Sequence, residues 1–150
     1  MKNTLIICFA VLLFSCSPAD KNKTSHEADN YVQSEGTVNE ADIAEVYYFH
    51  GTRRCATCKA VARVAKGYTR INYEEEIKKG LVKVMEIDFD KSGNEALVEK
   101  FQVTRSGLFV RTVINNHETI YNLTEMAFMN AELHPDKIRE AIKMEIEKVL

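Results

Sequence analysis

Two cysteines separated by two residues, Cys55 and Cys58, are the side chains of this sequence best suited to chemistry. Residues at positions i and i+3 lie on one face of a helix, so the two sulfurs can come within bonding distance. At this spacing the pair can serve as a redox couple, as a structural disulfide or as part of a metal site. A structural disulfide is the weakest of the three readings, because closing so short a loop adds little chain-entropy stabilisation.

The sequence around the two cysteines favours redox chemistry. The run Glu45 to Phe49 predicts a buried strand that ends in a loop, and helical periodicity begins at Ala56. Cys55 then lies at a helix start, where unsatisfied N–H groups and the helix dipole favour its thiolate. Arg53 and Arg54 add positive charge in the same direction. We therefore expect Cys55 to be the nucleophile and Cys58, one turn into the helix, to be the more buried resolving thiol.

A metal site is the alternative use of the same segment. His50 stands five residues before Cys55, so His50, Cys55 and Cys58 could supply three ligands to copper(I), zinc or trivalent arsenic. Three ligands are too few for a structural zinc site. In the competing interpretation His50 caps the loop or lines a substrate groove.

The N-terminus has the pattern of an export signal in residues 1–15. Lys2 precedes an apolar run from Leu5 to Phe14, which is too short to span a bilayer. The sequence Leu13-Phe14-Ser15-Cys16 resembles the lipobox of bacterial lipoproteins, which implies that Cys16 is lipidated and anchors the chain to a membrane of the cell envelope. Since Cys8 leaves with the signal, Cys55 and Cys58 are expected to be the only free thiols.

Residues 16–41 predict a flexible tether, and residues 42–150 predict one domain. The tract from Ser17 to Glu40 is too polar to bury a core. The remaining length suits a single fold. The net charge of −2 leaves no basic stripe, so we expect no nucleic-acid partner. No Gly-rich phosphate cradle or dinucleotide signature is present, so we expect no cofactor.

Periodicity in the domain predicts alternating strands and helices. A helix from Ala56 is expected to break or kink at Gly67, and a second helix, 69–79, is expected to turn Ile71 and Ile77 inward. The other expected elements are a strand over 81–89, a helix over 94–101, a hairpin of 108–114 with 117–123 around Asn115-Asn116, and a helix over 138–150. The order β-α-β-α-β-β-α predicts an α/β fold with a central mixed sheet flanked by helices.

The segment from Tyr47 to Lys59 resembles the strand, loop and active-site helix start of thioredoxins. The expected element order is also similar, over about Ala44 to Leu150. A closer resemblance, through Tyr-Phe-His and Cys-x-x-Cys-Lys, is to small envelope thioredoxin-like proteins that carry the label of a nitrophenyl-compound nitroreductase subunit. The resemblance implies a thiol-disulfide oxidoreductase that exchanges electrons with client protein thiols or a membrane redox partner, or an accessory redox subunit that is inactive alone.

Two departures from the thioredoxin pattern bear on the site. Thioredoxins carry a buried acid on the strand before the motif, where this chain has Tyr48 or Phe49. They also place a cis-proline opposite the cysteines, where this chain has Gly107. The resemblance therefore implies an altered substrate groove, lined by His50, Ser106 and Gly107.

Overall fold

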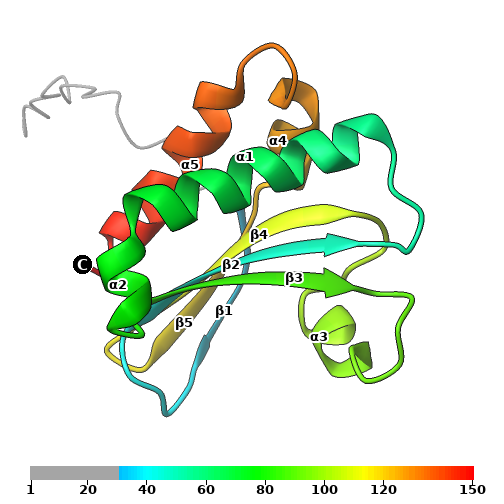
Figure 1. The fold of residues 1–150 in the computed structure, drawn as a ribbon. Coiled ribbons are helices and arrows are strands. Elements are labelled where there is room, and N and C mark those ends of the chain that lie inside the picture. Colours follow the sequence, from blue (N-terminus) through cyan, green and yellow to red (C-terminus); the bar gives the residue numbers. More distant parts are fainter. Residues whose placement is uncertain (1–30) are drawn as a thin grey trace, which may run out of the picture.

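A five-stranded mixed sheet forms the centre of the computed structural model, which describes residues 31–150 (Figure 1). The strand order is β1-β5-β4-β2-β3. The β2–β3 pair is parallel, and the other neighbours are antiparallel. The strands are β1 (Val32–Thr37), β2 (Ile43–His50), β3 (Val82–Asp88), β4 (Gly107–Ile114) and β5 (His117–Asn122). The expected α/β fold with a mixed sheet is confirmed.

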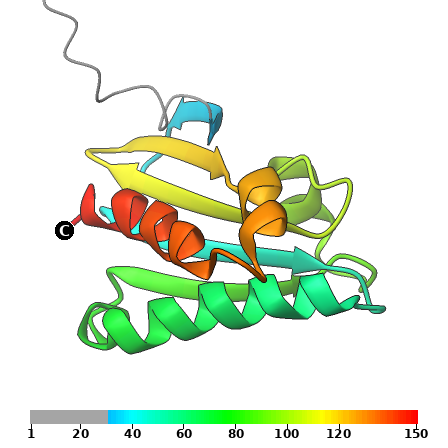
Figure 2. The ribbon, with the colours of Figure 1, turned by 90° about the horizontal axis from the view of Figure 1, so that it is seen from above.

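Helices lie on both faces of the sheet (Figures 1 and 2). One face carries α1 (Ala56–Asn72), α4 (Thr124–Asn130) and α5 (Pro135–Glu147). The opposite face carries the short α3 (Glu95–Lys100), and α2 (Glu74–Lys78) leads from α1 into β3. The predicted C-terminal helix is confirmed, and its Ile138, Ile142 and Ile146 are fully buried.

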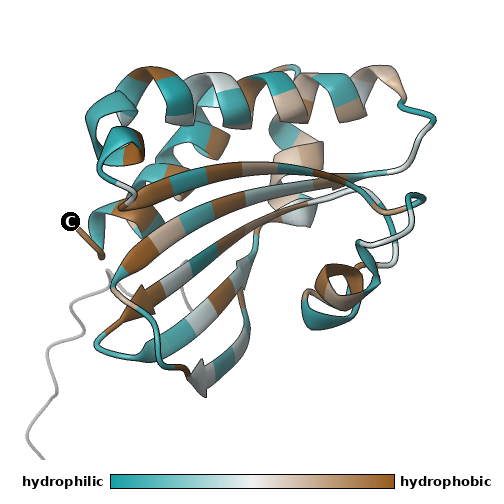
Figure 3. Cartoon of the chain, turned by 60° about the horizontal axis from the view of Figure 1, so that its bottom comes forward, coloured by the Kyte–Doolittle hydropathy of each residue, from teal (hydrophilic) through white to brown (hydrophobic). Residues whose placement is uncertain are grey.

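Strand β2 divides its side chains between two cores, because successive residues of a strand point to opposite faces. Val46 and Tyr48 belong to the core beneath α1 and α5. Tyr47 and Phe49 belong to the aromatic core beside α3. Figure 3 shows the hydrophobic (brown) and hydrophilic (teal) residues along the strands of the sheet. Strand β2 is therefore held by packing on both faces of the sheet, up to the loop that leads to the cysteines.

The prediction that Gly67 interrupts the first helix is wrong. Helix α1 continues through Gly67 to Asn72, and the helical region ends only at Gly80, whose φ is +79°. A glycine inside a helix costs about 1 kcal/mol, which the packing of Val61, Ala65 and neighbouring residues of α1 outweighs. The inward orientation predicted for Ile71 is also wrong, since its side chain is 79% exposed.

Part of the predicted tether is structured. Residues 32–37, within the segment 16–41, form β1 and pair with β5 at the edge of the sheet. Hydrogen bonds rather than apolar burial hold β1, since Gln33 Nε2 donates to the Phe101 carbonyl at 2.6 Å and Asn122 Nδ2 donates to Gln33 Oε1 at 2.8 Å. The polarity of the segment, from which a tether was predicted, therefore does not reveal a strand of this kind.

The predictions for the N-terminus concern residues that the structure does not describe. The signal over 1–15, the lipidated Cys16 and the first half of the tether all lie outside residues 31–150. Within the described range, none of the helices combines the length and the apolar character needed to cross a bilayer.

The predicted hairpin is confirmed, together with its turn. Asn115 and Asn116 have φ values of 52° and 65°, the left-handed conformation that a two-residue type I′ turn requires. The turn directs β5 back along β4, and β5 then leads into α4, a helix that periodicity did not indicate.

Candidate functional site

The two cysteines lie where β2 has ended and α1 begins. Cys55 is the N-cap of α1, and its sulfur accepts a hydrogen bond from the backbone N–H of Cys58 at 3.1 Å. The sulfur thereby takes the place of the oxygen that a serine or aspartate would offer at a helix start. Both cysteines are free thiols, Cys55 exposed and Cys58 buried. This is the arrangement that the spacing predicted.

Hydrogen bonds favour ionisation within the pair. Burial of the Cys58 thiol opposes its ionisation, but hydrogen bonds from Cys55 and from the Ser106 hydroxyl lower the pKa of Cys58 below its usual value. The Cys58 thiol therefore ionises more readily than an isolated thiol does.

Tyr48 is one of the two residues, with Phe49, that the resemblance puts where thioredoxins have an acid. Its ring is fully buried, and its hydroxyl donates to the backbone carbonyl of Cys58 at 2.7 Å. Burial, followed by the nearby Cys58, raises the pKa of Tyr48 well above its usual value, so the phenol remains neutral. Tyr48 thus fixes the first turn of α1 and does not supply a carboxylate.

A carboxylate does lie nearby, on β3. Glu86 stands opposite Tyr48 in the β2–β3 register and is paired with Arg54 at 2.7 Å and with Lys66. Partial burial opposes the ionisation of Glu86, but Lys66, Arg54 and His50 together lower its pKa. Glu86 therefore holds the side chains of Arg54 and Lys66 close to the start of α1.

Glu86 changes the role expected for the two arginines. The guanidinium of Arg54 is directed to Glu86 and lies over the Tyr48 ring, 5.5 Å from its centre, so its charge is already compensated by a carboxylate. Arg53 is exposed and has no hydrogen bond or ion pair within residues 31–150. The contact that the structure shows at the Cys55 sulfur is the N–H of Cys58 at the start of α1, and neither arginine donates a hydrogen bond to it within residues 31–150.

The proposed metal set of His50, Cys55 and Cys58 is not assembled. A carbonyl can only accept, so Nδ1 of His50 donates to the Gly51 carbonyl at 2.8 Å, while Nε2 faces Glu86 at 3.5 Å. In residues 31–150 no group of three His, Cys, Asp or Glu side chains converges as a metal site. The three predicted ligands are not brought together here, because β2 ends with the imidazole turned toward β3, and a metal bound by His50 with the two sulfurs stays a prediction.

Two residues at the start of β4 complete the surroundings of the thiols. Ser106 Oγ lies 3.9 Å from Cys58 Sγ, at the long end of a sulfur hydrogen bond. Gly107 pairs with Phe49, and a Cβ on it would lie only 2.7 Å from both Phe109 Cε2 and Thr124 Oγ1. Ser106 and Gly107 therefore lie at the dithiol as expected, and only glycine fits the second position.

Sequence reasoning missed Glu86 and the hydroxyl of Tyr48. The strand expected over 81–89 contains Glu86, but only the register of β3 against β2 brings this residue to Arg54 and His50. That register depends on contacts between segments more than thirty residues apart.

Searches of family models, of curated proteins and of solved structures returned no match to this chain. The functional assignment therefore depends on the geometry around Cys55 and Cys58.

Proposed function

We propose that this chain is a thiol-disulfide oxidoreductase built on a thioredoxin-like domain and tethered to a bacterial envelope membrane through lipid on Cys16. One observation carries the proposal: the exposed Sγ of Cys55 caps α1 by accepting the N–H of the buried Cys58 at 3.1 Å. Such a sulfur is accessible to a partner and is stabilised as a thiolate. The second sulfur is held one turn away, where it can reach the first.

The reaction follows from the different exposure of the two sulfurs. The Cys55 thiolate attacks one sulfur of a client disulfide, which forms a mixed disulfide and releases the other client sulfur as a thiolate. The Cys58 thiolate then attacks Cys55 Sγ, which closes the Cys55–Cys58 disulfide and releases the second client thiolate. The protons of the two enzyme thiols pass to the client thiolates, so two electrons move from the dithiol to the client. The reverse sequence oxidises a client dithiol.

Three neighbouring groups support these steps. Ser106 can donate to the Cys58 thiolate as it forms, which is the direction in which it shifts the pKa of Cys58. Tyr48 holds the turn that carries Cys58 through its carbonyl. Gly107, which follows Ser106, lets the start of β4 pack closely against Phe109 and Thr124. Client protein thiols or a membrane redox partner would approach on the exposed side of Cys55.

The test is to equilibrate the full chain, purified in detergent, with glutathione buffers of graded potential. Free thiols are then counted by alkylation and mass spectrometry. We expect a single two-electron transition, loss of that transition in Cys55→Ser, and catalysis of insulin reduction by the wild type alone. Cys58→Ser is expected to accumulate a mixed disulfide with glutathione. A thiol state that does not respond to the buffers would disprove the proposal.

The membrane anchor has a separate test in cells. We expect the wild-type chain in the membrane fraction and Cys16→Ser in the soluble fraction. Equal distribution of both proteins would refute lipid anchoring and would leave the dithiol chemistry untouched.

A further inference from the structure

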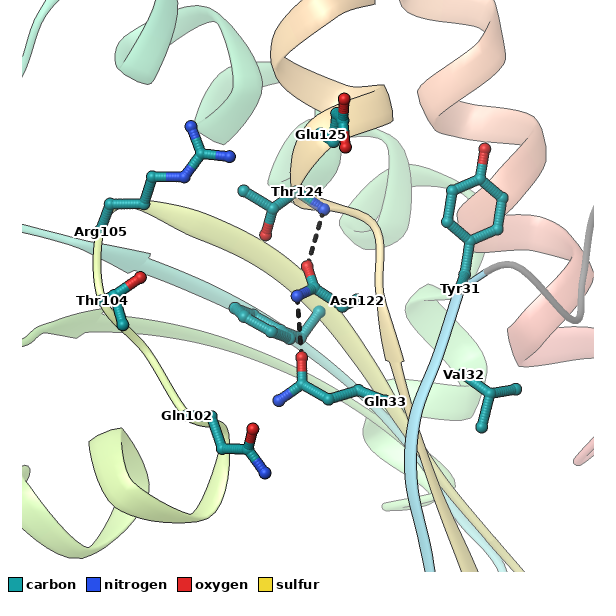
Figure 4. Close-up of a pocket in the computed structure, with 10 residues that line it drawn as sticks. Tyr31, Val32, Gln33, Gln102, Thr104, Arg105, Asn122, Thr124 and Glu125 are labelled. Atoms are coloured by element: carbon teal, nitrogen blue, oxygen red, sulfur yellow. Dashed lines mark hydrogen bonds between the residues drawn. The ribbon is translucent and has the colours of Figure 1, made fainter.

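A cavity of about 470 Å³ opens beside the segment that carries Ser106 (Figure 4). Its lining comes from β1, from the end of β5 with the start of α4, and from the segment between α3 and β4. Polar side chains dominate it: Gln33, Gln102, Thr104, Asn122 and Thr124. Phe109 and Tyr31 add aromatic surface. Its size suits a small molecule that makes several directional contacts.

A chain of hydrogen bonds makes one wall of this cavity rigid. Asn122 Oδ1 accepts the N–H of Thr124 at 3.1 Å, and Asn122 Nδ2 donates to Gln33 Oε1 at 2.8 Å. Gln33 Nε2 donates in turn to the carbonyl of Phe101 at 2.6 Å. These amides are held in place before any ligand arrives, which lowers the entropy lost on binding.

Two opposite charges remain free at one end of the cavity. Figure 4 shows the guanidinium of Arg105 and the carboxylate of Glu125 on the same side, above Thr124. Within residues 31–150 neither side chain forms an ion pair or hydrogen bond, and the two do not pair with each other. A ligand that presents both a carboxylate and an ammonium group could pair with the two side chains.

The cavity is connected to the dithiol through the chain itself. Arg105 directly precedes Ser106, whose Oγ is 3.9 Å from Cys58 Sγ. Gly107 lies against Thr124, because a Cβ there would come within 2.7 Å of Thr124 Oγ1. The two charges and the sulfurs therefore lie at the same end of the sheet, where the end of β2, the start of β4 and the end of β5 meet.

We propose that this cavity binds the amino-acid end of a small zwitterionic disulfide, which the dithiol then reduces. Arg105 takes the α-carboxylate and Glu125 the α-ammonium. The inference depends on the proposed function, because the dithiol is the reductant. Cys55 attacks one sulfur of the ligand and releases one thiol, and Cys58 displaces the second. The ligand gains two electrons and two protons, and the chain keeps the Cys55–Cys58 disulfide.

The test compares four small disulfides with the reduced full chain. Cystine and bis(2-hydroxyethyl) disulfide have no net charge, and of these two only cystine carries the zwitterion. Glutathione disulfide carries the same zwitterionic end farther from its sulfurs, with one additional carboxylate on each half, and cystamine carries ammonium groups alone. Loss of free thiols is followed by acid quenching and alkylation. Each second-order rate constant is divided by that of dithiothreitol with the same disulfide, which removes differences in intrinsic reactivity.

We expect this normalised rate to be at least about tenfold higher for cystine, glutathione disulfide or both than for cystamine and the hydroxyethyl compound. Arg105→Gln and Glu125→Gln should each lower the ratio of zwitterion to neutral disulfide by about two- to fivefold, the upper part of the range for an exposed ion pair. The matched surface variants Arg139→Gln and Glu99→Gln should leave the ratio as in the wild type.

The outcomes separate the two proposals. If none of the four disulfides oxidises the dithiol, the proposed function fails. If all four react with equal normalised rates, or if Arg105→Gln and Glu125→Gln change no ratio, the dithiol is active and the zwitterion site is refuted. A preference for glutathione disulfide without cystine assigns the site to the longer ligand, and the converse assigns it to the free amino acid.

Discussion

Replacement of Gly107 by alanine tests the tight packing at the start of β4. The new Cβ would lie 2.7 Å from Phe109 Cε2 and from Thr124 Oγ1, and 3.3 Å from Phe109 Cζ. Ordinary carbon contacts lie near 3.5 to 4.0 Å, so the neighbours must move by close to 1 Å. Phe109 cannot move freely, because its ring contacts those of Phe49 and Phe101 with centroids 5.5 Å away.

The expected loss of stability follows from two opposing effects. Overpacking of a close-packed site costs about 1 to 3 kcal/mol. The lower entropy of the unfolded alanine chain returns about 0.4 to 1 kcal/mol. We therefore expect Gly107→Ala to lower the free energy of unfolding by about 1 to 2 kcal/mol, or Tm by roughly 3 to 10 °C for a domain of this size.

Urea unfolding of the reduced protein at pH 7 measures this change. The matched control is Gly67→Ala, since a Cβ at Gly67 meets nothing within 4 Å and the residue lies inside α1. Gly67→Ala should stabilise the protein by about 0.5 to 1 kcal/mol. If Gly107→Ala is as stable as wild type, or more stable, the result would refute the tight packing of Gly107 against Phe109 and Thr124.

Three further perturbations test the charges and the thiols. Arg111→Met should cost about 3 kcal/mol in urea unfolding, because it leaves the buried Glu45, which Arg111 contacts at 2.7 Å, without its main partner. Glu86→Gln should flatten the acid limb of stability against pH: the folded pKa of Glu86 lies below its ordinary value of 4.5, so its contribution is complete above that value and is lost as pH falls through the lower folded pKa. Ser106→Ala should raise the pKa of Cys58, followed as thiolate absorbance at 240 nm, because one donor to the thiolate is removed.

Each of these perturbations has a matched control elsewhere on the surface. Lys78→Met removes an exposed cation from two carboxylates and should leave the urea unfolding curve close to that of the wild type. Glu99→Gln should leave the acid limb unchanged, and Ser92→Ala should leave the thiolate titration unchanged. Equal effects of a variant and its control would show that the contact assigned to that variant has no special role.

The sequence pattern predicted an element correctly where residues close in sequence determine its conformation. The hairpin at Asn115-Asn116 was predictable because few residues other than glycine and asparagine tolerate the φ that its turn needs. The burial of Ile138, Ile142 and Ile146 follows from their spacing. Local pattern failed at Gly67 and Ile71, where the packing of α1 as a whole decided how far the helix extends.

For the site, the sequence by itself determined that two thiols at i and i+3 start a helix, with Cys55 exposed and Cys58 buried, because spacing and helix geometry fix both. Only the tertiary structure decided that Arg54 and His50 face Glu86, and that β1 closes a polar cavity beside Ser106. These contacts join segments distant in sequence, and their geometry depends on strand register, which no single segment encodes.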